Sequence, residues 1–183
     1  MKVYLLGIFI LQLFTFSAGA QRLQTKNAEI SFTSNAQLEV ISASSSKAVG
    51  IINTTTSEFA FKVDIRSFNG FNSELQRQHF YDNYMETEKY PSAAFSGKII
   101  EQIDFSHDGT YEVRAKGDLD IHGEKQTRII KCKMVIRNNT ATLDSRFLVP
   151  LVDHNIKIPK IVNQKIATEI EVIFKATLTT QQQ

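Results

Sequence analysis

Apolar and polar side chains alternate along most of this 183-residue chain, and that period of two limits what the chain can fold into. In residues 58–68, EFAFKVDIRSF, apolar side chains occupy every second position and charged ones lie between several of them. Residues 111–122 and 166–178 repeat the pattern. Strict alternation is typical of strands with one buried and one wet face, as in antiparallel sheets. The chain is therefore predicted to be all-β.

Shorter strands are expected elsewhere, and turn residues separate them. They are predicted over residues 28–33, 37–42, 48–53, 93–103, 128–137 and 140–150. The dipeptides Asp108-Gly109 and Asn138-Asn139 fit tight hairpin turns. About eight strands can form a two-sheet sandwich or a closed barrel with a lumen, and the pattern alone does not choose between them.

One segment departs from the period of two. Apolar residues in residues 71–85 recur at intervals closer to 3.6, which predicts a single helix there. Asn72 or Ser73 is its expected N-cap. The Tyr90-Pro91 step then forces an extended backbone before the next strand. We expect the helix to cross between strands and to close one end of the fold.

The first twenty residues have the character of a signal peptide. Lys2 gives a positive start, an apolar run follows, and Ala18 and Ala20 supply small residues at a cleavage site. Cleavage leaves residues 21–183 as one domain of 163 residues (183 minus 20). We expect this mature protein to be periplasmic or secreted. Its 20 basic residues (21 minus Lys2) against 19 acidic ones give no basic footprint for nucleic acid.

Two motifs resemble those of the YceI-like family. The first is HFYDNYMETEKYPSAAF at residues 79–95, and the second is a Gly-x-Leu-x-Ile-x-Gly strand at residues 117–123. The resemblance extends over about residues 29–178. It implies a single antiparallel lipocalin-like β-barrel of about eight strands, with one helix between strands near residues 71–85. It also implies that a long isoprenoid chain can be held inside the barrel.

Catalytic and metal-binding motifs are not found in the sequence. The four histidines show no H-x-H or H-E-x-x-H spacing, so no metal site is expected, and His122 is expected to be solvated. No nucleophile motif and no phosphate-binding glycine loop is present. The single cysteine, Cys132, shares an alternating face with apolar residues and is expected to be a buried, inert thiol. We therefore expect no enzyme activity and no cofactor.

The inward-facing side chains are the remaining candidates for a function. The residues expected to line an apolar lumen are Phe59, Phe61, Val63, Ile65, Phe95, Tyr111, Val113, Leu119, Ile130, Met134, Ile170, Val172 and Phe174. Arg77 and His154 are the candidates for contacting a polar head group at the mouth. Burial of a hydrocarbon chain is favourable by roughly 0.8 kcal/mol per CH₂, so such a lumen can bind a lipid without catalytic residues.

The leading hypothesis is an exported, non-catalytic protein that carries or stores a polyisoprenoid or similar long-chain amphiphilic lipid. Transient membrane contact is possible for such a carrier, and the sequence does not define its oligomeric state. The alternative is a solid-cored stress-related or interaction protein that binds a protein partner through its outer surface. The same apolar side chains serve either hypothesis, because they can surround a ligand or fill the barrel themselves.

Overall fold

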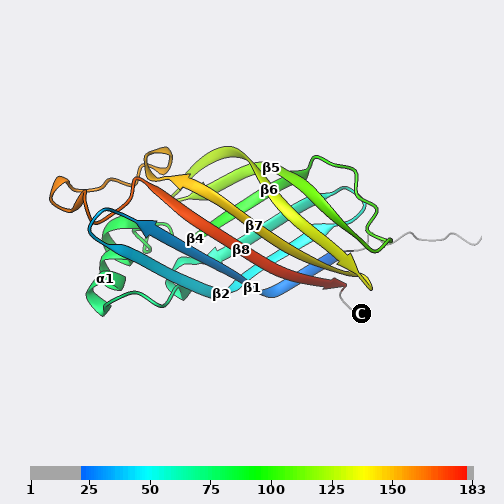
Figure 1. The fold of residues 1–183 in the computed structure, drawn as a ribbon, viewed down its shortest axis with the longest axis horizontal. Helices are drawn as coiled ribbons and strands as arrows, with labels where there is room; N and C mark the ends of the chain where they lie inside the picture. Colours follow the sequence, from blue (N-terminus) through cyan, green and yellow to red (C-terminus); the bar gives the residue numbers. More distant parts are fainter. Residues whose placement is uncertain (1–21, 181–183) are drawn as a thin grey trace, which may run out of the picture.

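Eight antiparallel strands form a closed barrel in the computed structural model, which describes residues 22–180 (Figure 1). The strands are β1 (Arg22–Asn35), β2 (Val40–Asn53), β3 (Glu58–Asp64), β4 (Ser92–Ile99), β5 (Gly109–Ile121), β6 (Glu124–Arg137), β7 (Thr140–Pro150) and β8 (Glu169–Thr180). Each strand pairs with its neighbour in sequence, and β1 closes the barrel by pairing with β8. The predicted all-β barrel is confirmed. The expected signal peptide, residues 1–20, lies outside the described residues.

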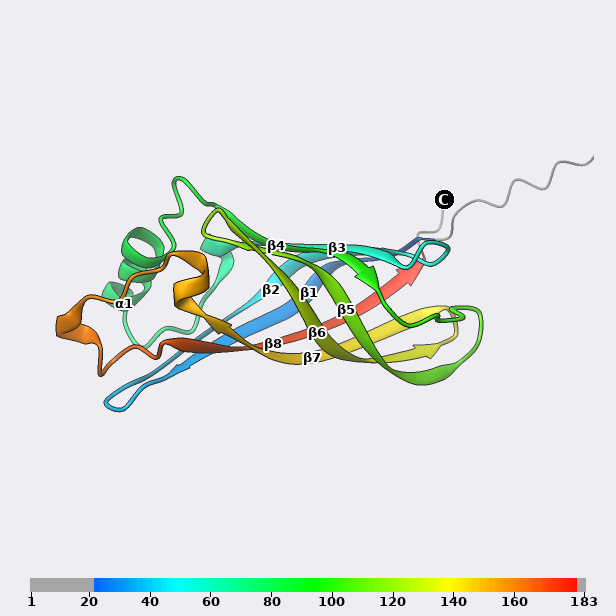
Figure 2. The ribbon, with the colours of Figure 1, turned by 90° about the horizontal axis from the view of Figure 1, so that it is seen from above.

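The predicted helix is present and is shorter than the sequence pattern suggested. Helix α1 (Glu74–His79) has Ser73 as its N-cap, and the Ser73 hydroxyl accepts a hydrogen bond from the Gln76 backbone N–H at 3.2 Å. A π-helical turn, η2 (Phe80–Tyr84), follows directly. Both lie between β3 and β4 at one end of the barrel, which we call the helix end (Figure 2). Within residues 22–180, no helix has the length and apolar character needed to cross a bilayer.

Three short 3₁₀ segments complete the connections. The first, η1 (Ile65–Ser67), follows β3, and η3 (Leu151–His154) and η4 (Lys160–Val162) lie between β7 and β8. The loop that carries η4 projects beyond the strands at the helix end, beside α1 and the β1–β2 turn (Figure 2). Several loops of different origin therefore gather at the same end of the barrel.

Of the two predicted hairpin turns, one is correct. Asn138 and Asn139 both have positive φ, +48° and +59°, as a two-residue type I′ turn between β6 and β7 requires. The turn at Asp108-Gly109 was wrong, because residues 100–108 form a longer loop and Gly109 already belongs to β5. The Asp108 carboxylate instead accepts the backbone N–H of Asn138 at 3.0 Å, which ties this loop to the neighbouring hairpin.

The second strand is longer than expected. Residues 37–42 and 48–53 were predicted as separate strands, and the structure has a continuous β2 that includes the polar run between them. The Ser45 and Ser67 hydroxyls are hydrogen-bonded at 2.6 Å, and the backbones of Ser44 and Asn69 exchange two bonds of 2.8 Å. The β3–α1 connection therefore supplies partners for the Ser45 hydroxyl and the Ser44 backbone, while Ser42, Ser46 and Lys47 are exposed on the outer face.

The barrel is filled with side chains at the end opposite the helix. Residues buried to below a tenth of their surface there are Leu23, Phe105, Ile136, Ala141 and Leu178. Ile136 pairs with Ala141, and Ala141 pairs with Leu178, so adjacent strands contribute to one packed layer. We call this the filled end. The solid core predicted as an alternative is therefore present in one part of the barrel.

Candidate functional site

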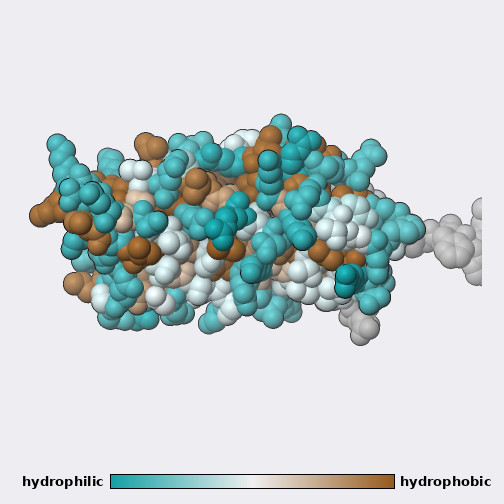
Figure 3. All heavy atoms as spheres, viewed as in Figure 1, coloured by the Kyte–Doolittle hydropathy of each residue, from teal (hydrophilic) through white to brown (hydrophobic). Residues whose placement is uncertain are grey.

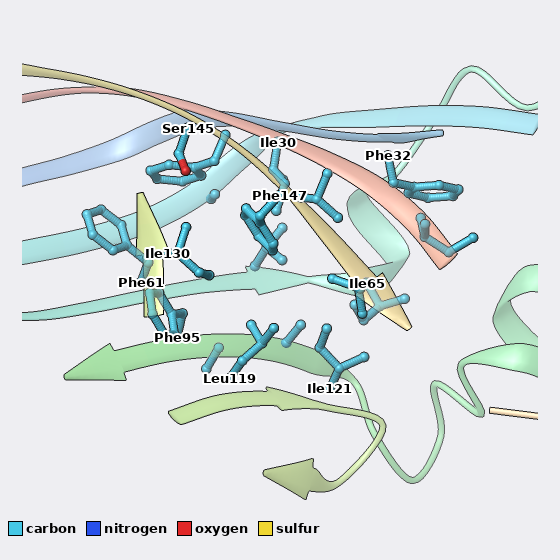
Figure 4. Close-up of a pocket in the computed structure, with 18 of the residues that line it drawn as sticks. Ile30, Phe32, Phe61, Ile65, Phe95, Leu119, Ile121, Ile130, Ser145 and Phe147 are labelled. Atoms are coloured by element: carbon cyan, nitrogen blue, oxygen red, sulfur yellow. The ribbon is translucent and has the colours of Figure 1, made fainter. Parts of the chain in front are cut away.

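An apolar cavity of about 260 Å³ occupies the barrel between the filled end and the helix end (Figure 4). All eight strands contribute to its wall, together with α1, η2 and the connection between β7 and β8. The polar side chains along the wall are those of Ser34, Lys62, Gln76 and Ser145, and Tyr84 and Cys132 add a hydroxyl and a thiol. The alternation noted in the sequence explains this composition, because each strand turns its apolar face inward.

Twelve of the thirteen predicted lumen residues lie at the cavity wall. They are Phe59, Phe61, Val63, Ile65, Phe95, Val113, Leu119, Ile130, Met134, Ile170, Val172 and Phe174. The exception is Tyr111, which does not line the cavity and packs partly buried against the core. Tyr111 points inward at a level nearer the filled end, since it lies two residues from Gly109, whose partner is Ile136. Alternation gives the face of a residue but not its depth along the barrel.

Four of the predicted phenylalanines form one cluster across strands β3, β4 and β8. The Phe59 and Phe95 ring centroids are 4.9 Å apart, and Phe61 contacts Phe174 edge-on at 5.0 Å. Phe59 and Phe61 are themselves 6.1 Å apart. Such tilted and edge-on pairs are favourable aromatic geometries, so the cluster forms a closely packed part of the wall.

A second aromatic cluster, near the helix end, was missed by the sequence analysis. Its members are Phe32, Phe68, Phe71, Phe80 and Tyr81. Phe32 comes from β1 and stacks on Phe80 of η2 with ring centroids 5.1 Å apart. The other members come from the segment between β3 and β4, where apolar residues do not recur at every second position. They approach β1 only in the folded chain. The predicted helix could have indicated this cluster, because a helix that closes a barrel end must turn apolar residues toward the lumen.

Three of the polar side chains along the wall are hydrogen-bonded to the backbone or to another side chain. The Ser145 hydroxyl donates to the Lys131 carbonyl at 2.7 Å, and the Ser34 hydroxyl accepts from the Ala167 N–H at 2.9 Å. The Gln76 side-chain amide donates to the Glu39 carboxylate at 3.0 Å. Neither serine hydroxyl is hydrogen-bonded to a general base, and the wall presents hydrocarbon with few polar exceptions.

The two head-group candidates lie away from the cavity wall. The Arg77 guanidinium is bound to Glu74 at 2.6 Å within α1. His154 is fully buried, and its Nδ1 donates to the Glu124 carbonyl at 3.1 Å. This bond and that from Gln126 to the Asp153 carbonyl, at 2.8 Å, fix η3 against β6. The geometry accounts for His154 as a structural residue and does not favour head-group contact by either side chain.

His122 is not the solvated residue that the sequence suggested. Its side chain is 10% exposed and packs edge-on against Tyr90, with the two ring centroids 4.6 Å apart. The Nε2 atom lies 2.9 Å from the Glu86 carboxylate, and Nδ1 lies 3.1 Å from the His154 carbonyl. Both neighbours are acceptors, so both bonds form together only when each ring nitrogen carries a proton. His122 therefore joins the β5–β6 turn to η3 and to the loop after η2.

Glu86 gives this junction a dependence on pH. Hydrogen bonds from Lys89 and, second, from His122 lower the pKa of the Glu86 carboxyl below its ordinary value of 4.5. A carboxyl with a lowered pKa stabilises the fold above that ordinary value, and the contribution disappears as the pH falls through the lowered pKa. The stabilising contribution of ionised Glu86 should therefore be lost in moderately acidic solution.

We expect Glu86→Gln to flatten the acid side of the stability profile. Between about pH 6 and about pH 3, the urea midpoint of the variant should fall less than that of the wild type. The matched control is Glu88→Gln, which removes an exposed carboxylate from the same loop. A Glu86→Gln profile that runs parallel to the wild-type profile would contradict the role of Glu86.

Cys132 lies at the cavity wall, partly buried between Ile130 and Met134 on the inward face of β6. Burial raises the pKa of its thiol to about 11. Because the thiolate is the reactive form, only roughly a thousandth of the thiol is reactive at about pH 8. This environment agrees with the buried, inert thiol expected from the sequence.

We expect Cys132 to react with iodoacetamide at least about tenfold more slowly in the native protein than in urea. An occupant of the cavity should slow the reaction further, because the thiol is part of the wall. A double variant with Cys132→Ala and Ser46→Cys, which places the thiol on the exposed face of β2, should react at the ordinary rate. Equal reaction rates for the native wild type and the native double variant would show that Cys132 is not buried in the cavity wall.

Among residues 22–180, no group of three or more His, Cys, Asp or Glu side chains is arranged to hold a metal ion. A closed antiparallel barrel of eight strands with one internal cavity belongs to the class of small barrels that can enclose a single ligand. The sequence matches the YceI-like domain over residues 21–178. The protein is a member of the YceI-like family, as the two sequence motifs predicted.

Solved structures share this fold at low sequence identity. A polyisoprenoid binding domain from Saccharophagus degradans, implicated in plant cell wall breakdown, has a TM-score of 0.71 at 17% identity, covering 88% of this chain and 99% of that one. BcnA from Burkholderia cenocepacia has a TM-score of 0.68 at 16% identity, covering 84% and 96%. The Campylobacter jejuni YCEI protein has a TM-score of 0.57 at 13% identity, covering all of both chains. A search of curated proteins gave no match.

The family motifs have structural explanations. Gly97 and Gly117 face each other on β4 and β5, and a Cβ on either would lie 2.1 Å from a carbonyl oxygen of the other strand. Gly123 has φ of +75° in the β5–β6 turn, and a Cβ there would lie 2.5 Å from the Tyr90 ring. The Gly-x-Leu-x-Ile-x-Gly strand and the Tyr-Pro step therefore contact each other in the fold.

Proposed function

We propose that the protein is an exported, non-catalytic carrier or store that holds the tail of a polyisoprenoid or similar long-chain amphiphilic lipid. The cavity carries this proposal, because its wall is apolar along nearly all of its length and has one filled end. Each CH₂ group that enters such a cavity from water contributes roughly 0.8 kcal/mol. A long tail can therefore bind well through contact area, with few polar contacts.

The size of the cavity bears on the kind of lipid. Its volume of about 260 Å³ lies just below the range of about 300–1,000 Å³ that is usual for ligand pockets. A single narrow chain fits these dimensions better than a bulky polycyclic ligand. A long polyisoprenoid would extend toward the helix end and would displace rings of the second aromatic cluster, such as Phe71 and Phe80.

The absence of catalysis is part of the proposal and rests on the chemistry of the wall. Ser34 and Ser145 are hydrogen-bonded to backbone groups, and Cys132 is held as a neutral thiol. An acyl-transfer site would need a nucleophile hydrogen-bonded to a base. Export is supported by the signal-like residues 1–20, and the lipid class by the description of the Saccharophagus degradans domain as polyisoprenoid binding.

The proposal is tested by native mass spectrometry of the protein purified from its own cells without detergent, followed by organic extraction. A discrete added mass that extracts as an isoprenoid supports the proposal and identifies the lipid. A bare chain that stays bare after incubation with polyprenyl lipids would overturn it. The outer surface would then become the functional part, as in the alternative of an interaction protein.

A further inference from the structure

Large apolar side chains are exposed together at the helix end of the barrel. Leu38 lies in the β1–β2 turn, Leu75 in α1 and Ile161 in η4, and Ile161 is 91% exposed. The Leu38 backbone N–H donates to the Gln164 carbonyl at 2.9 Å, which joins the turn to the η4 loop. We call Leu38, Leu75 and Ile161 the end patch. Figure 3 shows apolar atoms projecting at this end among hydrophilic ones.

The η4 loop that carries Ile161 is also basic. Residues 156–168 contain Lys157, Lys160 and Lys165 and no acidic residue, and all three lysines are exposed. No acidic group within residues 22–180 forms a salt bridge with any of them. Of the neighbouring carboxylates, Glu74 is ion-paired with Arg77, whereas Glu39 accepts a hydrogen bond from the neutral Gln76 amide and keeps its negative charge. Three lysines against this one carboxylate leave a positive net charge for a partner at this end.

The same loop borders the cavity. Ile156 and Ile166 line the cavity wall, and Ile161, midway between them, points into solvent. Packed side chains block the opposite end of the barrel, so a ligand that enters or leaves along the barrel passes the η4 loop. The basic and apolar surface thus lies where a lipid would be exchanged.

We propose that the end patch and the η4 loop dock the protein on an anionic lipid bilayer. Apolar side chains entering the headgroup region, together with lysines held near anionic headgroups, are the two ordinary contributions to such binding. A protein surface as partner would have to match a flat, acidic and apolar face, whereas an anionic bilayer offers both properties at once. The proposal rests on the proposed function for its purpose, which is exchange of the lipid with the membrane.

Vesicle flotation tests the docking directly. The probes are vesicles of phosphatidylcholine with and without phosphatidylglycerol, and neither contains a polyisoprenoid. We expect the protein to float with the anionic vesicles, and the binding to weaken at high salt because salt screens exposed charges. Equal binding to neutral vesicles, or no binding to anionic vesicles, would overturn the proposal.

Variants assign the effect to the surface. The double variant Lys160→Gln/Lys165→Gln should lower the partition coefficient by at least about tenfold, given roughly fivefold per lysine. Ile161→Ser should lower it by about tenfold. The matched control is Ile129→Ser/Lys131→Gln, which changes the same residue types on the exposed face of β6 and should bind as the wild type does. A loss as large in the control as in the loop variants would contradict the assignment.

The test separates docking from cargo binding. None of Lys160, Ile161 and Lys165 lines the cavity, so each variant should still take up a soluble fluorescent lipid analogue with wild-type affinity in the absence of vesicles. For the wild-type protein, uptake of the analogue without docking on anionic vesicles would overturn this inference and leave the proposed function standing. Docking of the wild-type protein without uptake would overturn the proposed function and leave the docking standing.

Discussion

Phe61→Asp is expected to abolish lipid binding and to destabilise the barrel by about 3–5 kcal/mol, the usual range for removing a packed phenylalanine. The Phe61 ring contacts Phe174 edge-on and also lies against the β2 backbone at Gly50. A Cβ built on Gly50 would lie only 1.9 Å from the Cδ1 atom of Phe61. The substitution removes these contacts and places an unpaired carboxylate on the apolar wall. Urea unfolding and uptake of a fluorescent lipid analogue measure the two effects.

The adjacent residue provides the control. Ala60→Asp introduces the same carboxylate one position along β3, where the side chain is exposed on the outer face and does not line the cavity. We expect it to change stability by less than about 0.5 kcal/mol, as is usual for surface substitutions, and to leave binding intact. Wild-type stability and binding in Phe61→Asp would show that the assignment of the inward face of β3 is wrong.

The fold was predictable because the alternation of apolar and polar side chains is repeated in most of the strands. Alternation assigned the inward faces of β3, β5 and β8 correctly, and the family motifs decided for a barrel over a sandwich. The strand through residues 42–47 was not predicted, since the buried Ser45 hydroxyl and the Ser44 backbone find their partners in the distant β3–α1 connection. A local pattern contains no information about a hydrogen bond that forms only across the folded chain.

The site was predictable in part for the same reason. Twelve wall residues follow from the period of two, while Tyr111 does not because periodicity gives no position along the barrel axis. The aromatic residues contributed by α1 and η2 and the burial of His122 depend on how loops fold over the helix end. His122 sits in a tight turn, where sequence predicts exposure, and is covered by Glu86, Tyr90 and η3 from elsewhere in the chain.

The partly filled barrel reconciles the two sequence hypotheses. A solid core at Ile136, Ala141 and Leu178 supplies stability that does not depend on a ligand. The cavity can then remain unfilled between the two ends, because the packed layer and the closed hydrogen-bond ladder hold the strands in place. Binding and folding are thereby separated along the barrel axis, so variants can affect one without the other.

Ala115→Phe is expected to lower lipid affinity by at least about a hundredfold while leaving the protein folded. Ala115 faces the cavity on β5, between Val113 and Gly117, and a phenyl ring there would occupy space that a lipid tail needs. A ligand excluded from a few CH₂ positions loses roughly 0.8 kcal/mol for each one, so four lost positions already exceed a hundredfold. Titration with a fluorescent lipid analogue measures the affinity, and thermal unfolding measures the stability.

The matched control places the same ring on the opposite face of the barrel. Ala60→Phe on β3 adds a phenyl group at an exposed position and should bind lipid as the wild type does. Unchanged affinity in Ala115→Phe, with a stability equal to that of the wild type, would mean that lipid does not occupy this cavity. Loss of affinity in Ala115→Phe alone would place the tail within the barrel, because both variants add the same ring and only Ala115→Phe adds it on the inner face.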